Sequence, residues 1–282
     1  IDILNRKMLN KYINKLKQLN AEQKIIIIAF LVALPLLFLR PLSMFTDGIS
    51  RHIINVEQVV SGSLNFHTWP LYIFVLVMPR LFFSGILLEF SYKLFSFFIY
   101  VLMLFLIRPL LNQLSLNKRE RIIVIVLFLF SAWTILLSSS VLQDMLLCVM
   151  FFVVFLMLNI YLKNPSFRNG FLLFLFSVFL IYTKQTAALL FFGLGFYVLF
   201  KKTSVRKKIS SILIMFLGAL TILFWMIKNF VQRGNMFSGG VSSGFGIGIE
   251  NMPYADIAVN AYYYFWEIVL PSKNTLGGLM GG

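Results

Sequence analysis

Acidic residues are scarce in this sequence of 282 residues. Asp and Glu number 10 together, against 25 Lys and Arg, and the four types make up only 12% of the chain. A soluble globular domain carries about a quarter of its residues as charged side chains. The composition therefore excludes an ordinary soluble domain. Hydrophobic residues instead make up 60% of the chain, and Phe alone occurs 32 times.

Cysteine and histidine are nearly absent as well. Cys148 is the single cysteine, so no internal disulfide can form, and its place in an apolar run indicates a small buried hydrophobic side chain. The two histidines are His52 and His67. They lack a close pair of carboxylates, so the sequence falls short of a zinc-binding pattern.

The net charge of +15 comes from short basic segments that separate apolar runs. This distribution follows the positive-inside rule for membrane proteins and does not indicate nucleic-acid binding. We therefore expect residues 1–24, 117–121 and 201–208 to lie in the cytoplasm. The basic N-terminus has no small-residue cleavage site, so we expect the first span to remain as an anchor.

The apolar runs predict an all-α, polytopic bundle of transmembrane helices with about seven spans. No internal repeat and no soluble domain is visible in the pattern. The predicted spans are residues 25–39, 92–111, 122–137 and 142–162, two short spans within 170–200, and 209–227.

Residues 70–88 can be interpreted in two ways. A full crossing by this segment would place the basic residues 117–121 outside, against the positive-inside rule. We therefore predict that it is a re-entrant or interfacial helix on the outer side, broken at Pro79-Arg80.

The first outer loop carries a polar group of unusual composition: Asp47, Arg51 and His52. Apolar residues recur at helical spacing from residue 48 to 60, which predicts an interfacial helix with Asp47 at its N-cap and Gly62 at its end. Asp47 could act as a general base, and Arg51 and His52 could bind a phosphate or a sugar. The alternatives are a simple cap and the polar face of an interfacial helix.

Three further residues are candidates for binding. Asp144 follows a Ser-rich turn at the outer end of a span, where it can bind a ligand or serve a helix dipole. Lys184 lies at the tip of the hairpin within 170–200, where it can bind a lipid phosphate or reach the headgroups. Arg233 lies in the predicted outer loop 228–258, on the side where positive residues are disfavoured.

In their order along the chain, these segments resemble the C-type (GT-C) glycosyltransferase superfamily, the polytopic enzymes that use polyprenyl-phosphate-linked sugars. The acidic motif and helix of 47–62, followed by Pro70-Leu71-Tyr72, match the first outer loop of that family. Asp144 and Thr183-Lys184 match its later outer segments, and 228–235 is similar to its Arg-Asn…Thr-Gly-Asn-Pro segment. Many members carry a second acid where this chain has Gly48, so a second carboxylate is not assigned.

The resemblance implies an integral enzyme of the cell (inner) membrane with a cytoplasmic N-terminus. It would transfer a sugar from a polyprenyl-phosphate donor to a lipid, glycan or protein acceptor at the outer face. Asp47 would be the catalytic base, and Asp144, Lys184, Arg51, His52 and Arg233 would bind substrates. No cofactor is assigned, and a divalent metal ion, which Asp144 would help to place, is left open.

We also keep alternative interpretations: a transporter or lipid flippase, an envelope polysaccharide polymerase or ligase, and a structural membrane partner. The chain begins without Met and ends in Gly-Gly-Leu-Met-Gly-Gly, so we expect a fragment. The expected organisation is a basic N-terminus over 1–24, a catalytic transmembrane module over 25–258 and the start of a truncated element over 259–282.

Overall fold

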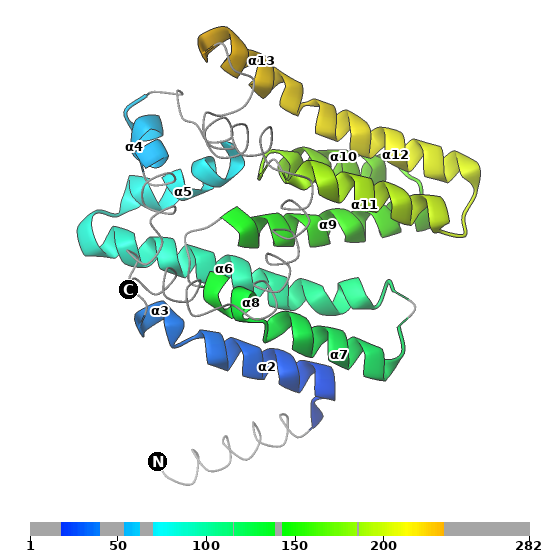
Figure 1. The fold of residues 1–282 in the computed structure, drawn as a ribbon, viewed down its shortest axis with the longest axis horizontal. Coiled ribbons are helices and arrows are strands. Elements are labelled where there is room, and N and C mark those ends of the chain that lie inside the picture. The colour runs from blue at the N-terminus through cyan, green and yellow to red at the C-terminus, as the bar shows by residue number, and fades with distance from the viewer. Residues whose placement is uncertain are drawn as a thin grey trace, which may run out of the picture.

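A computed structural model describes residues 18–39, 54–62, 70–114, 116–138, 143–184 and 186–233. These residues form helices joined by short turns, with no strand among them, as the sequence predicts (Figure 1). The helices are α2 (Ala21–Ala33), α3 (Leu36–Leu39), α4 (Ile54–Val60), α5 (Pro70–Phe82), α6 (Gly85–Leu111), α7 (Lys118–Leu129), α8 (Ala132–Leu137), α9 (Gln143–Lys163), α10 (Phe167–Ile181), α11 (Ala187–Phe200), α12 (Val205–Leu220) and α13 (Ile222–Arg233).

Four helical segments are long and apolar enough to cross a membrane: Ala21–Phe38, Gly85–Leu111, Gln143–Lys163 and Val205–Lys228. This confirms the prediction of an all-helical chain suited to a membrane. The apolar helices α10 and α11 contain 15 and 14 residues. At 1.5 Å per residue each is about 22 Å long, which is shorter than the hydrocarbon core of about 30 Å.

Asn20 and Asn117 begin two neighbouring helices in the same way. Each Asn side chain accepts a hydrogen bond from a backbone N–H of the first turn, and the third helical residue, Gln23 or Glu120, bonds back to the Asn backbone. These reciprocal bonds satisfy N–H groups that a helix start leaves free. The caps place the starts of α2 and α7 at one end of the bundle (Figure 1).

Two predicted spans contain breaks. The segment 122–137 divides into α7 and α8 because Ser131 caps a new helix, with its Oγ accepting from the Thr134 N–H at 3.2 Å. The segment 209–227 divides at Thr221, whose Oγ1 donates to the Gly218 carbonyl at 2.7 Å. Hydroxyl groups that bond nearby backbone compete with helical continuation. The helix is therefore interrupted within both predicted spans, although Val205–Lys228 as a whole remains long and apolar enough to cross a membrane.

The prediction that the helix is broken at Pro79-Arg80 was wrong. Helix α5 continues through Pro79 to Phe82, and the chain turns only at residues 83–85, where Gly85 has φ of +57°. Such a positive φ favours glycine, which explains why the turn forms there. The predicted helix end at Gly62 is confirmed, since α4 ends at Val60 and Gly62 has φ of +86°.

Helix α9 is central to the packing and contributes buried residues to each of two hydrophobic clusters that the described residues form. It packs against α6 on one side and α10 on the other. Helix α12 approaches α10 closely at Gly218, where an added Cβ would lie 2.7 Å from the Ser177 Cβ. Small residues at such a crossing let two helix backbones approach each other in a membrane protein.

The two ends of the bundle differ in composition. We call one the basic end; it contains residues 118–121, Lys163 and the 201–208 turn (Figure 1). Lys163 donates to Gln113 at 2.9 Å and Lys207 donates to the Leu162 carbonyl at 3.1 Å, which holds these segments together. We call the opposite one the far end; it contains α4, α5, the start of α9 and the turn at 182–186.

Candidate functional site

Asp144 and Lys184 meet at the far end. Asp144 lies in the first turn of α9, and Lys184 lies in the turn that joins α10 to α11. The Lys184 Nζ donates to Asp144 Oδ1 at 2.5 Å, and the side chains are 26% and 39% exposed respectively. The structure thus brings together two residues that the sequence analysis singled out separately. A charge-assisted hydrogen bond of this kind is strong, yet both groups remain open to solvent or a ligand.

The turn that carries Lys184 is fixed by its neighbours. The Tyr182 carbonyl accepts from the Leu71 N–H at the start of α5, at 3.1 Å. The Tyr182 hydroxyl donates to the Thr221 carbonyl at 2.7 Å, at the break between α12 and α13. Burial raises the pKa of the Tyr182 hydroxyl, so it keeps the proton that it donates. These bonds hold the hairpin tip against two other helices, so Lys184 occupies a defined position.

Buried polar side chains lie near the pair. Tyr72 of α5 is fully buried, lies beside Ser96 of α6 and is within electrostatic reach of Asp144. Ser96 is also buried and donates to the Tyr92 carbonyl at 3.1 Å. Ser96 could not be identified from the sequence, because a single Ser in an apolar run forms no recognisable motif. Tyr72 was noted only as part of the Pro70-Leu71-Tyr72 segment on which the family resemblance partly depends.

A second ion pair joins α4 to α5. Arg80 donates two hydrogen bonds to the Glu57 carboxylate, at 2.5 Å from Nε and 3.1 Å from Nη2. The Glu57 carboxylate raises the pKa of the Arg80 guanidinium. The pair joins α4 to the last turn of α5. It positions α4 at the far end.

Several predicted site residues are not placed by the structure. Asp47, Arg51 and His52 lie outside the described residues, as do 234–282, which include most of the predicted Gly-rich loop and the expected C-terminal element. Arg233 is the last residue of α13, so the prediction that residue 228 begins a loop was wrong. Lys228 lies in the same helix, with its Nζ 4.3 Å from the Trp225 ring centroid.

Asp144 does not fit a divalent metal ion within the described part of the chain. No group of three His, Cys, Asp or Glu side chains gathers among the described residues. The atom that contacts Asp144 is the ammonium nitrogen of Lys184, and a second cation beside it would be repelled. Divalent cations such as Mg²⁺ and Ca²⁺ prefer several oxygen ligands, which this pair does not supply.

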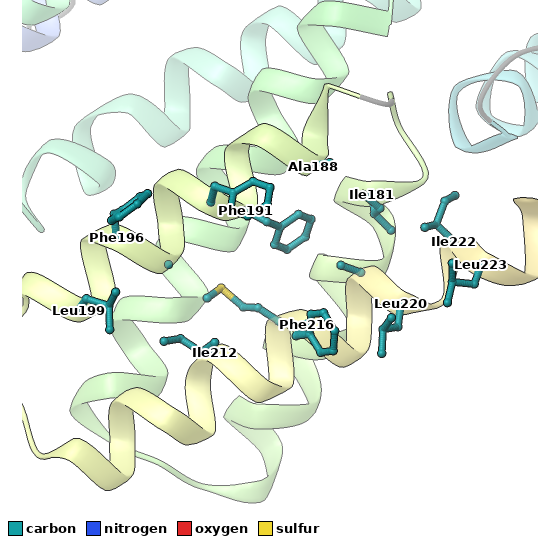
Figure 2. Close-up of a pocket in the computed structure, with 14 residues that line it drawn as sticks. Ile181, Ala188, Phe191, Phe196, Leu199, Ile212, Phe216, Leu220, Ile222 and Leu223 are labelled. Carbon is teal, nitrogen blue, oxygen red and sulfur yellow. The ribbon is translucent and has the colours of Figure 1, made fainter. Parts of the chain in front are cut away.

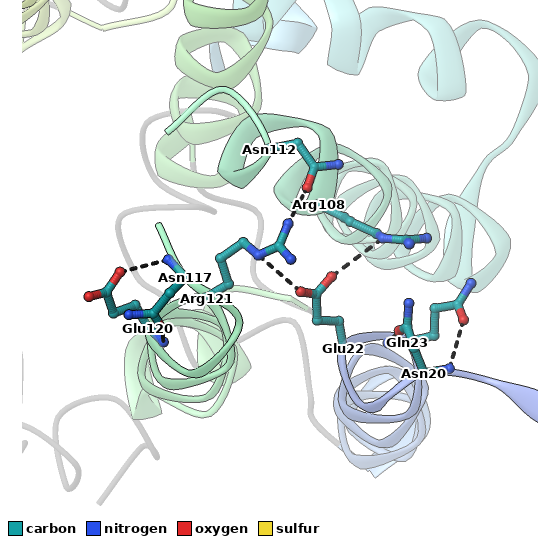
Figure 3. Close-up of polar contacts among 8 residues, drawn as sticks. All are labelled: Asn20, Glu22, Gln23, Arg108, Asn112, Asn117, Glu120 and Arg121. Carbon is teal, nitrogen blue, oxygen red and sulfur yellow. Dashed lines mark hydrogen bonds and ion pairs between the residues drawn. The ribbon is translucent and has the colours of Figure 1, made fainter. Parts of the chain in front are cut away.

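The basic end holds a buried carboxylate. The Glu22 side chain is 7% exposed and lies 3.4 Å from Arg108 Nε and 3.3 Å from Arg121 Nε. Arg121 also donates to Asn112 at 2.6 Å, so the group joins α2, α6 and α7 (Figure 3). Sequence reasoning missed this cluster, because Glu22 lies far from both arginines along the chain.

Asn159 forms a second buried polar group near the basic end. Its Oδ1 accepts from the Tyr197 hydroxyl at 2.7 Å and from Lys201 Nζ at 3.3 Å, while its Nδ2 donates to the Phe155 carbonyl at 2.9 Å. The side chain is thus satisfied at both ends, as a buried amide requires. The contacts tie α9 to α11 and have a structural role.

Comparison with protein-family models, curated proteins and solved structures finds no match to this chain.

Proposed function

We propose that the chain is a multi-pass glycosyltransferase of the cell membrane with a cytoplasmic N-terminus. It transfers a sugar from a polyprenyl-phosphate-linked donor to a lipid, glycan or protein acceptor at the outer face. The proposal includes a bundle of seven spans, in which α10 and α11 form a short hairpin and α4 and α5 lie at the outer interface. The far end is then the outer end.

The observation that carries the proposal is the half-exposed pair of Asp144 and Lys184 at the end of an apolar bundle. Charged side chains are costly at this depth and mark binding sites in membrane proteins. In the absence of substrate each charge neutralises the other. A donor phosphate can replace the carboxylate as the partner of Lys184, which frees Asp144 to orient an acceptor hydroxyl. The phosphate then neutralises Lys184, and the one net negative charge of the occupied site lies on the Asp144 carboxylate, which can accept a hydrogen bond from that hydroxyl.

The reaction is a displacement at the anomeric carbon with inversion. An acceptor oxygen forms the new glycosidic bond while the bond between the anomeric carbon and the phosphate oxygen breaks. The polyprenyl phosphate leaves with that electron pair, and the acceptor proton passes to the Asp47 carboxylate. Phosphate is a good leaving group, so the cation of Lys184 contributes by stabilising charge rather than by donating a proton.

Asp47→Asn tests the proposed base. An amide keeps the capping bond to the helix but cannot accept a proton. We expect sugar transfer to an acceptor in membranes to fall by at least about tenfold, equivalent to about 1.4 kcal/mol, with normal insertion and melting temperature. Glu120→Gln at the basic end is the matched control and leaves transfer unchanged. A smaller loss for Asp47→Asn would assign Asp47 to capping alone.

A lipid flippase or transporter is the second candidate, and the broken helices favour it. The breaks at Ser131 and Thr221 interrupt apolar segments, as in transporters whose discontinuous helices form the substrate site. No pair of inverted repeats accompanies them in the sequence. A radiolabelled donor sugar separates the candidates, since a transferase moves the label covalently to an acceptor and a flippase leaves it on the polyprenyl phosphate.

A further inference from the structure

An apolar groove lies between α11 and α12 and runs from the basic end toward the far end. It has a volume of about 500 Å³ and is lined by side chains of α11 and α12, by Ile181 of α10 and by Ile222 and Leu223 of α13 (Figure 2). Leu199 and Ile212 line one end, while Ile222 and Leu223 line the other. Its length along the helices matches an extended hydrocarbon chain, since the lining runs from Ala188 to Leu199, about 16 Å of helix.

The groove exists because α12 packs closely on α10 and only partly on α11. The close crossing at Gly218 holds α12 against α10, with an added Cβ predicted to clash with Ser177. On the α11 side, Gly195 lines the groove, and a Cβ added there would meet no atom within 4 Å. The space is therefore open to a partner that does not belong to the described part of the chain.

The two ends of the groove differ in charge. The turn at its Leu199 end contains Lys201, Lys202, Arg206, Lys207 and Lys208 and no acidic residue. Lys208 reaches across this end, with its Nζ donating to the Leu199 carbonyl at 2.6 Å. Lys202 and Arg206 are exposed and make no ion pair with any described residue. Toward the other end, Asp144 and Lys184 neutralise each other in an ion pair, and Lys228 of α13 lies over the Trp225 ring.

We propose that this groove binds one anionic phospholipid from the leaflet that faces the basic end. An acyl chain lies between α11 and α12, and the phosphate lies against Lys202 and Arg206. Each basic residue near an anionic lipid surface contributes about 1 kcal/mol, or about fivefold in affinity. The charge at the groove entrance decides the orientation, because the turn at the Leu199 end has five basic residues and no acidic one and therefore favours an anionic head. The inference does not depend on sugar transfer, which is assigned to the other end.

Native mass spectrometry of the full chain in mixed micelles tests the head-group contact. The micelles contain phosphatidylglycerol and phosphatidylcholine with identical acyl chains. We expect retained phosphatidylglycerol to exceed phosphatidylcholine by at least about fivefold. The double variant Lys202→Gln/Arg206→Gln should lose this preference. The matched control is Lys118→Gln/Arg119→Gln, an exposed pair at the same end of the bundle, and it should keep the preference.

A second pair of variants tests the acyl-chain contact. Gly195→Leu fills the groove, whereas Gly193→Leu adds the same side chain to the same helix at a position that is also open but does not line the groove. We expect Gly195→Leu to lower phosphatidylglycerol retention by at least about fivefold and Gly193→Leu to leave it unchanged. Equal melting temperatures show that both variants are folded.

Several results would overturn the proposal. One is an equal loss of preference in the Lys118/Arg119 control, which would indicate general attraction to the basic surface. Another is unchanged retention in Gly195→Leu. A third is a change of oligomeric state in Gly195→Leu, since a second copy of the chain would then occupy the groove. A fourth is that a polyprenyl phosphate displaces the phospholipid from the groove only when Lys184 is present.

Discussion

At the basic end, the Glu22 carboxylate is 7% exposed and lies beside two guanidinium groups, whereas at the far end the Asp144 carboxylate is 39% exposed and contacts one ammonium group. Opening the Glu22 cluster would leave the Glu22 carboxylate buried without a partner, which is costly, although its two arginines are partly exposed. Opening the Asp144–Lys184 pair exposes each charge to water or to a ligand. The comparison separates a charge cluster that holds helices together from one that can exchange partners.

The largest expected effect concerns the sides of the membrane that the two ends face. In a Cys148→Ala background, cysteines at Ser61 and Thr186 should react completely with an impermeant maleimide added outside sealed cells. Cysteines at Lys118 and Ser204 should react only after the membrane is opened. All four positions are exposed in the structure. Labelling of residue 118 from outside would mean that α5 crosses the membrane.

Glu22→Gln should cause the next largest effect. The substitution removes the counter-charge from Arg108 and Arg121, whose side chains are 42% and 27% exposed, so solvent screens the remaining charges and the cost is about 1–3 kcal/mol. Denaturant unfolding in micelles measures the loss. Glu120→Gln is the matched control, since Glu120 is exposed and Gln also serves in a capping box. Equal stability of the two variants would contradict the structural role of Glu22.

Substitutions at the far end should have the smallest effect on stability. Asp144→Asn and Lys184→Met each remove a partly exposed ion pair, and such pairs contribute less than about 1 kcal/mol. The same unfolding assay compares them with Glu22→Gln. A loss as large as that of Glu22→Gln would make the far-end pair a structural contact and remove the distinction between the ends.

Local patterns predicted the helices and several of their ends. Gly62 ends α4, Asp144 lies in the first turn of α9, and Lys184 lies between α10 and α11, as expected. These features depend on residues close together in the sequence, so hydrophobic periodicity and capping chemistry identify them.

Contacts between distant segments could not be predicted in this way. Nothing in the sequence near Asp144 indicates that Lys184 is its partner, because the packing of α9 on α10 creates that contact. The breaks at Ser131 and Thr221 involve single hydroxyl groups within apolar runs. A prediction based on the hydropathy of the whole run does not detect them. The buried state of Glu22 likewise depends on Arg108 and Arg121, which belong to other helices.

The most direct test of the central claim is a reversal of the far-end pair, Asp144→Lys/Lys184→Asp, assayed for both stability and sugar transfer. The account predicts stability within about 1 kcal/mol of the wild type, because the ion pair is kept. Transfer should still fall by at least about tenfold, with a raised donor KM, because a carboxylate now occupies the phosphate side. Lys184→Met should show the same rise in donor KM, and Lys184→Arg should keep part of the activity. Recovery of wild-type transfer in the reversed pair, after loss in each single variant, would contradict the account and make the pair purely structural.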